Sequence, residues 1–271
     1  MKTFFFLFFC LMSLCLSAKP LFEFGVGAFV LDLPYYPGSE NNKRVVAPIP
    51  IFIYRGEFFR ANRDGSVQGR FFNSDKLELN MSLSGTFPSN GDDNSARAGM
   101  PELDGLIEIG PSLKYYIIRN SKKSIYLSVP LRYAISSDFK ELNSRGVTLG
   151  TYISTRFRDV FSMNDYISFS AGLRYANQQL MDYYYTVKKD YSNTTRPIYY
   201  AKAGLFKYGI SSGFNHNFTK DFWVYGAASY SMYYGTANEN GPLLRRKSTL
   251  TFLVSLYWNI YKSKQSTKTV P

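Results

Sequence analysis

The chain has 271 residues, a formal net charge of +12 and an aromatic content of 18%. After the amino-terminal segment it contains no run of eighteen apolar residues, which excludes helical membrane spans from the rest of the chain. Its basic residues are dispersed, with no basic helix and no recognition motif, so nucleic-acid binding is not expected.

The amino-terminal segment has the pattern of a secretory signal peptide. Lys2 supplies a positive charge, Phe4 to Leu16 are apolar, and Ala18 is the small residue that a signal peptidase requires. We therefore expect cleavage after Ala18. Cys10 and Cys15 both lie within this segment, so the mature chain has no cysteine for thiolate metal sites or for cysteine catalysis.

The rest of the chain repeats one pattern, in which apolar and polar residues alternate over ten or so positions before a turn. Residues 77–84, 125–135 and 167–175 are clear examples, and this period of two predicts β-strands. Two of the expected strands are short and flanked by Gly56 and Gly65, so ten strands is the alternative to twelve. The predicted strands are 21–31, 45–54, 57–62, 66–72, 76–87, 105–118, 124–135, 147–158, 166–177, 206–218, 221–235 and 248–261.

The connections between these strands alternate in length. Short turns at 55–56, 73–75, 119–123, 159–165 and 219–220 alternate with long polar loops at 32–44, 88–104, 136–146, 178–205 and 236–247. Short periplasmic turns and longer extracellular loops are typical of outer-membrane barrels. We therefore predict an all-β fold, a single antiparallel transmembrane barrel over residues 19–261, with a signal peptide at 1–18 and a basic tail at 262–271.

A soluble barrel would also alternate, with its apolar face turned inward. The polar faces here are rich in Gly, Ser, Thr, Arg and Glu, which suits a wet lumen, and aromatic pairs such as Tyr115-Tyr116 and Tyr233-Tyr234 lie at strand ends. Aromatic rings at strand ends are typical of membrane interfaces. The pattern favours the outer membrane, where the barrel would contact membrane lipid and lipopolysaccharide.

Several charged residues share the inward phase of the predicted strands. Opposed carboxylates among them could perform acid–base chemistry, but charged lumens are common in barrels, and a bracing network is the favoured interpretation. In an open lumen the surplus of arginine would favour anions. The predicted lumen-facing residues are Glu23, Glu78, Glu108, Lys114, Arg132, Arg156 and Arg174.

Other candidate sites are weaker. The lone His216 cannot assemble a metal site, and the spacing of Asp92, Asp93 and Asn94 fits no known calcium loop, so we expect neither a metal nor a cofactor. The Asp182-Tyr183-Tyr184-Tyr185 stretch lies in the longest loop. It has two interpretations, an exposed contact surface or the continuation of a strand above the membrane.

Several motifs together resemble the MltA-interacting protein / OmpV family of outer-membrane proteins, over essentially the whole mature chain. The combination of Tyr-Pro-Gly-Ser with Pro-x-Pro is the most specific of them. The later stretches are Leu103-Asp104-Gly105, Gly110-Pro111, Asp182 to Tyr185, Arg196 and Tyr199, and the residues of the opening motif are Tyr36, Pro37, Gly38, Ser39, Pro48, Pro50, Tyr54, Arg55 and Gly56.

The resemblance implies a non-enzymatic protein that is linked to murein turnover. In the family's name-giving member it implies a bridge between a lytic transglycosylase and a penicillin-binding protein, and other members resemble porins or adhesins. An interaction protein is therefore the first expectation, and a narrow anion-favouring porin or a surface adhesin is the alternative. The chain differs from the family in extending past its last strand through Lys262 to Pro271.

Overall fold

The alternating segments form antiparallel strands in this computed structural model, which describes residues 21–56, 59–61, 67–89, 95–137 and 141–263. The predicted signal peptide, the Asp92 to Asn94 stretch and the tail beyond Ser263 lie outside the described residues. The strands are β1 (Leu21–Pro34), β2 (Asn42–Arg55), β3 (Phe59–Ala61), β4 (Val67–Asn73), β5 (Leu77–Thr86), β6 (Gly105–Arg119), β7 (Lys123–Ser137), β8 (Leu142–Arg158), β9 (Tyr166–Ala176), β10 (Gly204–Asn217), β11 (Phe222–Met232) and β12 (Ser248–Lys262).

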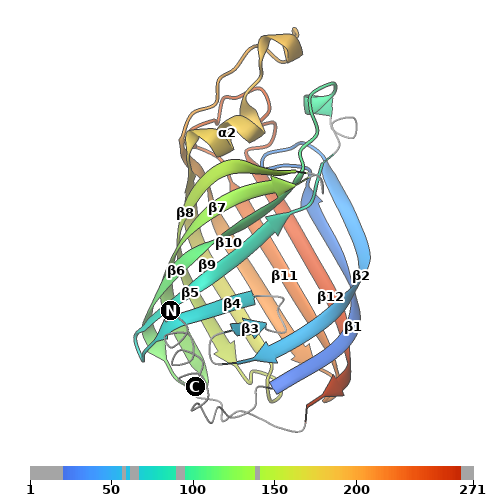
Figure 1. Cartoon of the computed structure of the whole chain (residues 1–271), viewed down its shortest axis with the longest axis vertical. Helices are drawn as coiled ribbons and strands as arrows, with labels where there is room; N and C mark the ends of the chain where they lie inside the picture. The colour runs from blue at the N-terminus through green and yellow to red at the C-terminus, as the bar shows by residue number, and fades with distance from the viewer. Residues whose placement is uncertain (1–20, 57–58, 62–66, 90–94, 138–140, 264–271) are drawn as a thin grey trace, which may run out of the picture.

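Each strand pairs with its neighbours in the sequence, and β1 also pairs with β12, so the described sheet closes on itself (Figure 1). Within the described ranges, three short helices, η2 (Ser95–Arg97), α2 (Gln178–Tyr185) and η3 (Lys189–Tyr191), lie in the loops. No described helix is long and apolar enough to cross a membrane. The predicted all-β antiparallel fold is confirmed.

The strands that flank the 136–146 loop are longer than predicted. β7 continues to Ser137 and β8 begins at Leu142, and these two residues are register partners. Only polar and small residues follow Leu142 as far as Gly146, so the apolar alternation gave no sign of a strand there. The pairing extends because backbone hydrogen bonds between neighbouring strands need no apolar face. The predicted loop is correspondingly shorter.

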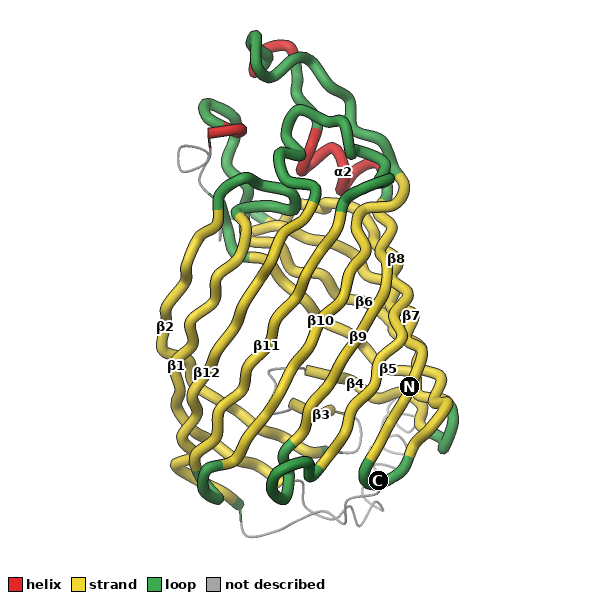
Figure 2. The backbone as a smooth tube through the Cα atoms, turned by 180° about the vertical axis from the view of Figure 1, so that it is seen from behind, coloured by secondary structure: helices red, strands yellow, loops and turns green. Residues whose placement is uncertain are grey.

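The two ends of the barrel differ. Figure 2 shows compact turns at one end, here called the short-turn end, and extended loops with the helices at the other, here called the long-loop end. The turn after β8 and the turn after β10 belong to the short-turn end, whereas α2 and the segment between β11 and β12 belong to the long-loop end. The short and long connections, which alternate along the sequence, thus lie at opposite ends of the barrel.

The outer face of the barrel is apolar and the inner face is mostly polar. Register partners across neighbouring strands keep the same face, so Ile210 lies beside Tyr230 and Tyr230 beside Leu250. These outward side chains are exposed, whereas inward residues of the same strands, such as Trp223 and Ser255, are buried. The most exposed outward side chains on the strands include Val46, Phe52, Ile107, Ile153, Phe169, Ile210, Trp258 and Ile260.

Strand β2 has one free edge over most of its length. All of β2 pairs with β1, but on its other side only Tyr54 and Arg55 pair with a described strand, β3 (Figure 1). Pro48 and Pro50 lie opposite Ala28 and Val26 of β1. Proline has no N–H, so within sheets it is confined to edges that make no such bond. The two prolines therefore remove hydrogen-bond donors from the free edge. β2 ends at Arg55, and Gly56 follows it.

Gly110 offers a test of the strand packing. A Cβ atom at this position would lie 2.0 Å from the carbonyl oxygen of Leu131, a backbone atom that cannot move aside easily. A Cβ at Gly69 would meet only the Met81 side chain, at an ordinary 3.7 Å. We predict that Gly110→Ala destabilises the barrel by roughly 1–3 kcal/mol and that Gly69→Ala has little effect. Urea unfolding in detergent, monitored by heat-modifiable gel migration, measures both; equal midpoints would contradict the packing.

Candidate functional site

The lumen gathers the charged residues of the inward face. Register partners on neighbouring strands lie on the same face of the sheet. Glu78 is the partner of Lys114, and Arg132 is the partner of the buried Thr148, so these charged side chains lie on the inner face. Glu23, Glu78 and Glu108 are all buried, with exposed fractions of at most 4%. Buried charges are costly unless they are paired, so their contacts determine what the lumen can do.

Glu78 forms the centre of a cluster near the short-turn end. Its side chain is 5% exposed and accepts a hydrogen bond from Lys114 Nζ at 3.2 Å. Several cations surround this one carboxylate, so the cluster is positively charged overall. The other partners are Asn80 Nδ2 at 2.7 Å, Tyr116 Oη at 3.1 Å, Arg119 at 3.6 Å and Arg70 at 4.0 Å.

Glu108 forms a second cluster toward the long-loop end. Its carboxylate pairs with the guanidinium of Arg174 and accepts a hydrogen bond from the Thr148 hydroxyl at 3.2 Å. Arg174 also donates to Thr148 Oγ1, at 3.1 Å. Arg132, on the neighbouring strand, donates from Nε to the Ser82 hydroxyl at 2.9 Å. The phase of the strands predicts that Glu108, Arg132 and Arg174 face the lumen, but it does not show that they form one cluster.

The remaining predicted charges lie apart from these two clusters. Glu23 accepts a hydrogen bond from Asn259 Nδ2 at 3.0 Å, and Lys262 Nζ lies 3.9 Å from its carboxylate. Arg156 lies over the ring of Tyr166, 4.4 Å from its centroid. Among the described residues the three inward glutamates occupy separate clusters, so they do not form the opposed pair that acid–base chemistry needs.

Three inward cations were not among the predicted site residues. Arg70 and Arg119 join the cluster of Glu78, and Lys207 is the register partner of Arg174. The phase of β4 and β10 could have identified Arg70 and Lys207 from the sequence alone. In the described part of the chain, no group of three or more His, Cys, Asp or Glu side chains is placed to hold a metal ion.

The first part of the family motif, Tyr36 to Ser39, lies at the long-loop end, where it joins loops that are distant in sequence, whereas Pro48 to Arg55 belong to β2. Tyr36 is 2% exposed and its hydroxyl donates to the Leu243 carbonyl at 2.6 Å. Gly38 adopts φ +82°, a conformation that favours glycine, and its carbonyl accepts from the N–H groups of Arg245 and Arg246. Ser39 is fully buried in the same turn. The motif thus anchors the first loop to the last.

The Tyr-rich stretch forms helix α2 rather than a continued strand, which corrects one interpretation from the sequence. Asn177 begins the helix, and its side chain accepts from the N–H groups of Leu180 at 3.2 Å and Val147 at 3.0 Å. Tyr184 and Tyr185 are 4% and 1% exposed, so these two side chains are not available for a surface contact.

These loops share one apolar core, here called the cap, which covers the long-loop end. The Tyr184 ring stacks on Phe206 at a centroid distance of 5.7 Å, and the Tyr185 hydroxyl donates to the Pro37 carbonyl at 2.9 Å. Burial raises the pKa of both tyrosines, so they remain neutral donors. The buried core of the cap comprises Tyr36, Ala96, Met100, Leu103, Leu106, Ala134, Ala176, Leu180, Met181, Tyr184, Tyr185, Val187, Ala201, Phe206, Tyr233, Leu243 and Leu244.

Two buried arginines hold the loops of the cap together. Arg97 donates to the Tyr184 carbonyl at 3.0 Å, and Arg196 donates to the carbonyl of Ala96 at 3.0 Å. Within α2, the side chain of Asp182 is exposed and that of Tyr183 is half-buried. Burial raises the pKa of Tyr183 to about 12, and its hydroxyl donates to a backbone carbonyl. Such buried, hydrogen-bonded arginines make the cap a packed structure rather than a set of free loops.

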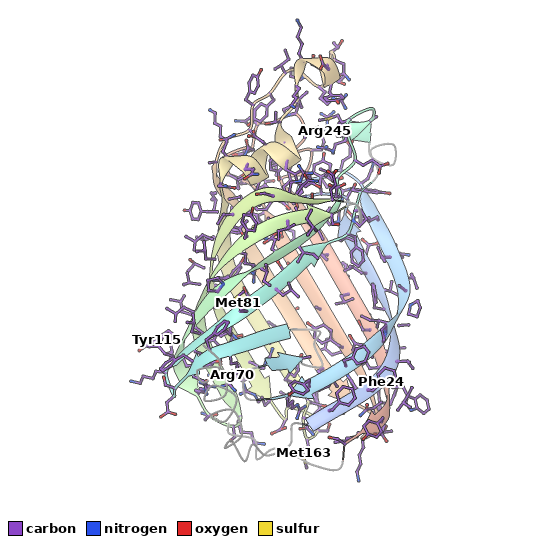
Figure 3. All side chains as sticks on the ribbon, in the orientation of Figure 1. Phe24, Arg70, Met81, Tyr115, Met163 and Arg245 are labelled. Carbon is purple, nitrogen blue, oxygen red and sulfur yellow. The ribbon has the colours of Figure 1, made fainter. Side chains whose placement is uncertain are left out.

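The short-turn end carries exposed apolar side chains on the turn after β8. Phe161 and Met163 are 73% and 79% exposed. Figure 3 shows Met163 at the opposite end of the barrel from Arg245. Asp165 anchors this turn by accepting from His216 Nδ1 at 2.7 Å and from the Asn217 N–H at 2.9 Å. Burial alone would raise the pKa of Asp165, but these hydrogen bonds outweigh it and lower the pKa.

A comparison with protein families assigns the chain to one family over nearly its whole length. The family model described as MltA-interacting protein MipA matches residues 24–260, from the first strand to the last. The chain belongs to the MipA family. The match includes the motif of Tyr36 to Ser39, the two prolines of β2 and helix α2. No curated protein matches the chain by sequence.

Three solved structures with a similar chain trace have low sequence identity to the chain. An outer membrane channel from Pseudomonas putida F1 has 10% identity and a TM-score of 0.43, over 90% of this chain and 97% of that one. The outer membrane protease OmpT from Escherichia coli has 8% identity and a TM-score of 0.33, over 89% and 96%. The Ralstonia pickettii toluene transporter TbuX has 9% identity and a TM-score of 0.34, over 91% and 90%.

The ion pair of Glu108 and Arg174 yields a prediction. Arg174→Met leaves Glu108 buried without its cation, and we expect a loss of roughly 3 kcal/mol in the free energy of unfolding. The matched control is Arg44→Met, because the exposed pair of Arg44 with Asp32 contributes at most about 1 kcal/mol. Urea unfolding of the detergent-refolded barrel compares the two. An equal effect of both changes would mean that the luminal pair does not brace the wall.

Proposed function

We propose that the chain is an outer-membrane barrel that is closed on its extracellular side and binds cell-wall enzymes on its periplasmic side. The observation that carries this proposal is the asymmetry of the two ends. The long-loop end is covered by the packed apolar cap, whereas the short-turn end presents Phe161 and Met163 to its surroundings. The proposal concerns the mature chain, which begins after cleavage at Ala18.

The location in the outer membrane is supported by the outer face of the barrel. Exposed side chains such as Ile153, Ile210 and Trp258 would be unfavourable in water but suit a lipid environment. The orientation follows from the usual asymmetry of such barrels, in which short turns face the periplasm and long loops face outward. In this orientation the cap faces the exterior, and outer-membrane lipid and lipopolysaccharide surround the wall.

The proposed docking surface is the apolar turn after β8 together with Phe218, which is 58% exposed. Protein interfaces are enriched in phenylalanine and methionine. The hydrogen bond between Asp165 and His216 fixes the base of this turn, which limits the ordering cost of binding. The turn therefore has the features of a preformed contact surface.

The partner class is supported by the family description, which names interaction with MltA, a lytic transglycosylase. A penicillin-binding protein as second partner follows only from the family resemblance. β12 ends with Lys262 at this same end, and the basic residues of the 262–271 segment are suited to an anionic partner. We propose no catalytic role for the chain itself.

A narrow anion-favouring porin is the second candidate, because cations outnumber carboxylates in the luminal clusters of Glu78 and Glu108. The cap argues against it, since its packed apolar core lies over the long-loop end. A surface adhesin that uses the loop after β9 is a third candidate. Burial of Tyr184 and Tyr185 leaves Asp182 and Tyr183 as the members of the Tyr-rich stretch that such an adhesin could use.

Substitution of the apolar turn tests the proposed docking. We expect the double variant Phe161→Ser, Met163→Ser to reduce co-purification of the lytic transglycosylase at least about tenfold, because apolar anchors dominate the energy of protein interfaces. The matched control is Tyr200→Ser, which removes a 72% exposed aromatic ring from the long-loop end. Quantitative affinity purification from detergent-solubilised membranes measures the enzyme bound per barrel. Unchanged co-purification by the double variant would remove the docking proposal.

A further inference from the structure

A small cavity with both polar and apolar lining lies on the inner face of β8 to β11, below the cap. Its volume is about 180 Å³, well below the roughly 300–1,000 Å³ of sites for drug-sized ligands. Arg174 and Lys207 line it together with Tyr152 and the hydroxyl-bearing Ser211, Ser229 and Ser231. The cavity therefore combines two cations with several hydrogen-bond donors in a space suited to a small ligand.

Lys207 has no carboxylate partner among the described residues. Among the described residues no carboxylate oxygen lies within 4.0 Å of its Nζ, and its hydrogen-bond partner is the Ser231 hydroxyl at 3.5 Å. Lys207 is also the register partner of Arg174 across β9 and β10. Like charges directly opposite each other on neighbouring strands destabilise a sheet. This pair of cations therefore needs a counter-charge.

Arg174 does not use all of its donors. Its terminal nitrogen pairs with Glu108 and Thr148, but its Nε is buried and has no hydrogen-bond partner. An unsatisfied buried donor costs about 1–3 kcal/mol, and more in a charged group. This donor lies at the edge of the cavity, where a bound anion would satisfy it.

The charges around the cavity do not balance. Arg132, Arg174 and Lys207 contribute three positive charges, and within the described part of the chain Glu108 is the carboxylate that acts on all three. The net charge of +2 is held between the barrel wall and the apolar cap, where solvation is weaker than in bulk water. A bound dianion would neutralise this charge.

We propose that this cavity binds a compact, doubly charged oxyanion of the sulfate or phosphate class. Arg174 and Lys207 supply charge-assisted hydrogen bonds, and the serine hydroxyls supply neutral ones. The ligand enters from the periplasmic side, because buried Phe206 and Tyr184 of the cap lie next to Arg174. The site requires neither an open channel nor a docked enzyme.

Isothermal titration of the refolded, signal-free barrel with sulfate and with phosphate tests the proposal. Chloride at matched ionic strength is the reference for general screening of charge. We expect saturable binding of sulfate or phosphate and none of chloride. Binding of neither oxyanion, or an equal response to chloride, would overturn the proposal.

Variants then localise the site. Lys207→Met should weaken oxyanion binding at least about tenfold, because it removes a charge-assisted bond. Lys202→Met is the matched control, since its side chain is exposed in the preceding loop, and it should bind as the wild type does. Heat-modifiable migration verifies folding, and Ser231→Ala replaces Lys207→Met if that variant fails to fold. Wild-type affinity in the cavity variant would overturn the assignment.

Discussion

Side chains alternate across a β-strand, and this constraint governs the rest of the molecule. Apolar residues such as Ile153, Ile210 and Trp258 occupy the outward positions, so the charged residues of the same strands are confined to the lumen. There Glu78 and Glu108 are each held by cations from neighbouring strands. The ion pairs cross-link the wall at two heights, and the surplus of positive charge remains inside.

The constraint ends where the strands end, and the long-loop end is organised differently. There the chain buries apolar side chains among its own loops, as a soluble domain does. Tyr36 and Gly38 bond the segment before β12, and Tyr185 bonds Pro37. The Tyr36 to Ser39 part of the family motif is thus a structural element of the cap. Among the described residues, the opposite end has a smaller buried cluster of Ile51, Ile53, Trp223 and Tyr257 on the inner face, and the side chains of Phe161 and Met163 on its turn are exposed.

Much of the fold could be predicted from the sequence, because period-two alternation reports which face each residue occupies. Most of the strands and the inward glutamates follow from that phase, whereas the 142–146 part of β8 does not. Helix α2 could not be recognised in this way, since it depends on the Asn177 cap and on packing against Phe206, which is distant in sequence. The ion pairs were equally inaccessible, because phase gives the face of Arg174 but not the strand stagger that brings it to Glu108.

The central claim is that the cap closes the extracellular end, so that the barrel functions through its periplasmic surface rather than as a pore. A planar-bilayer recording of the refolded, signal-free protein tests it most directly, with heat-modifiable migration as proof of folding. The account predicts a silent bilayer for the wild type. Steady anion-selective channels from the folded wild-type barrel would contradict it and would identify the lumen as a conducting pathway.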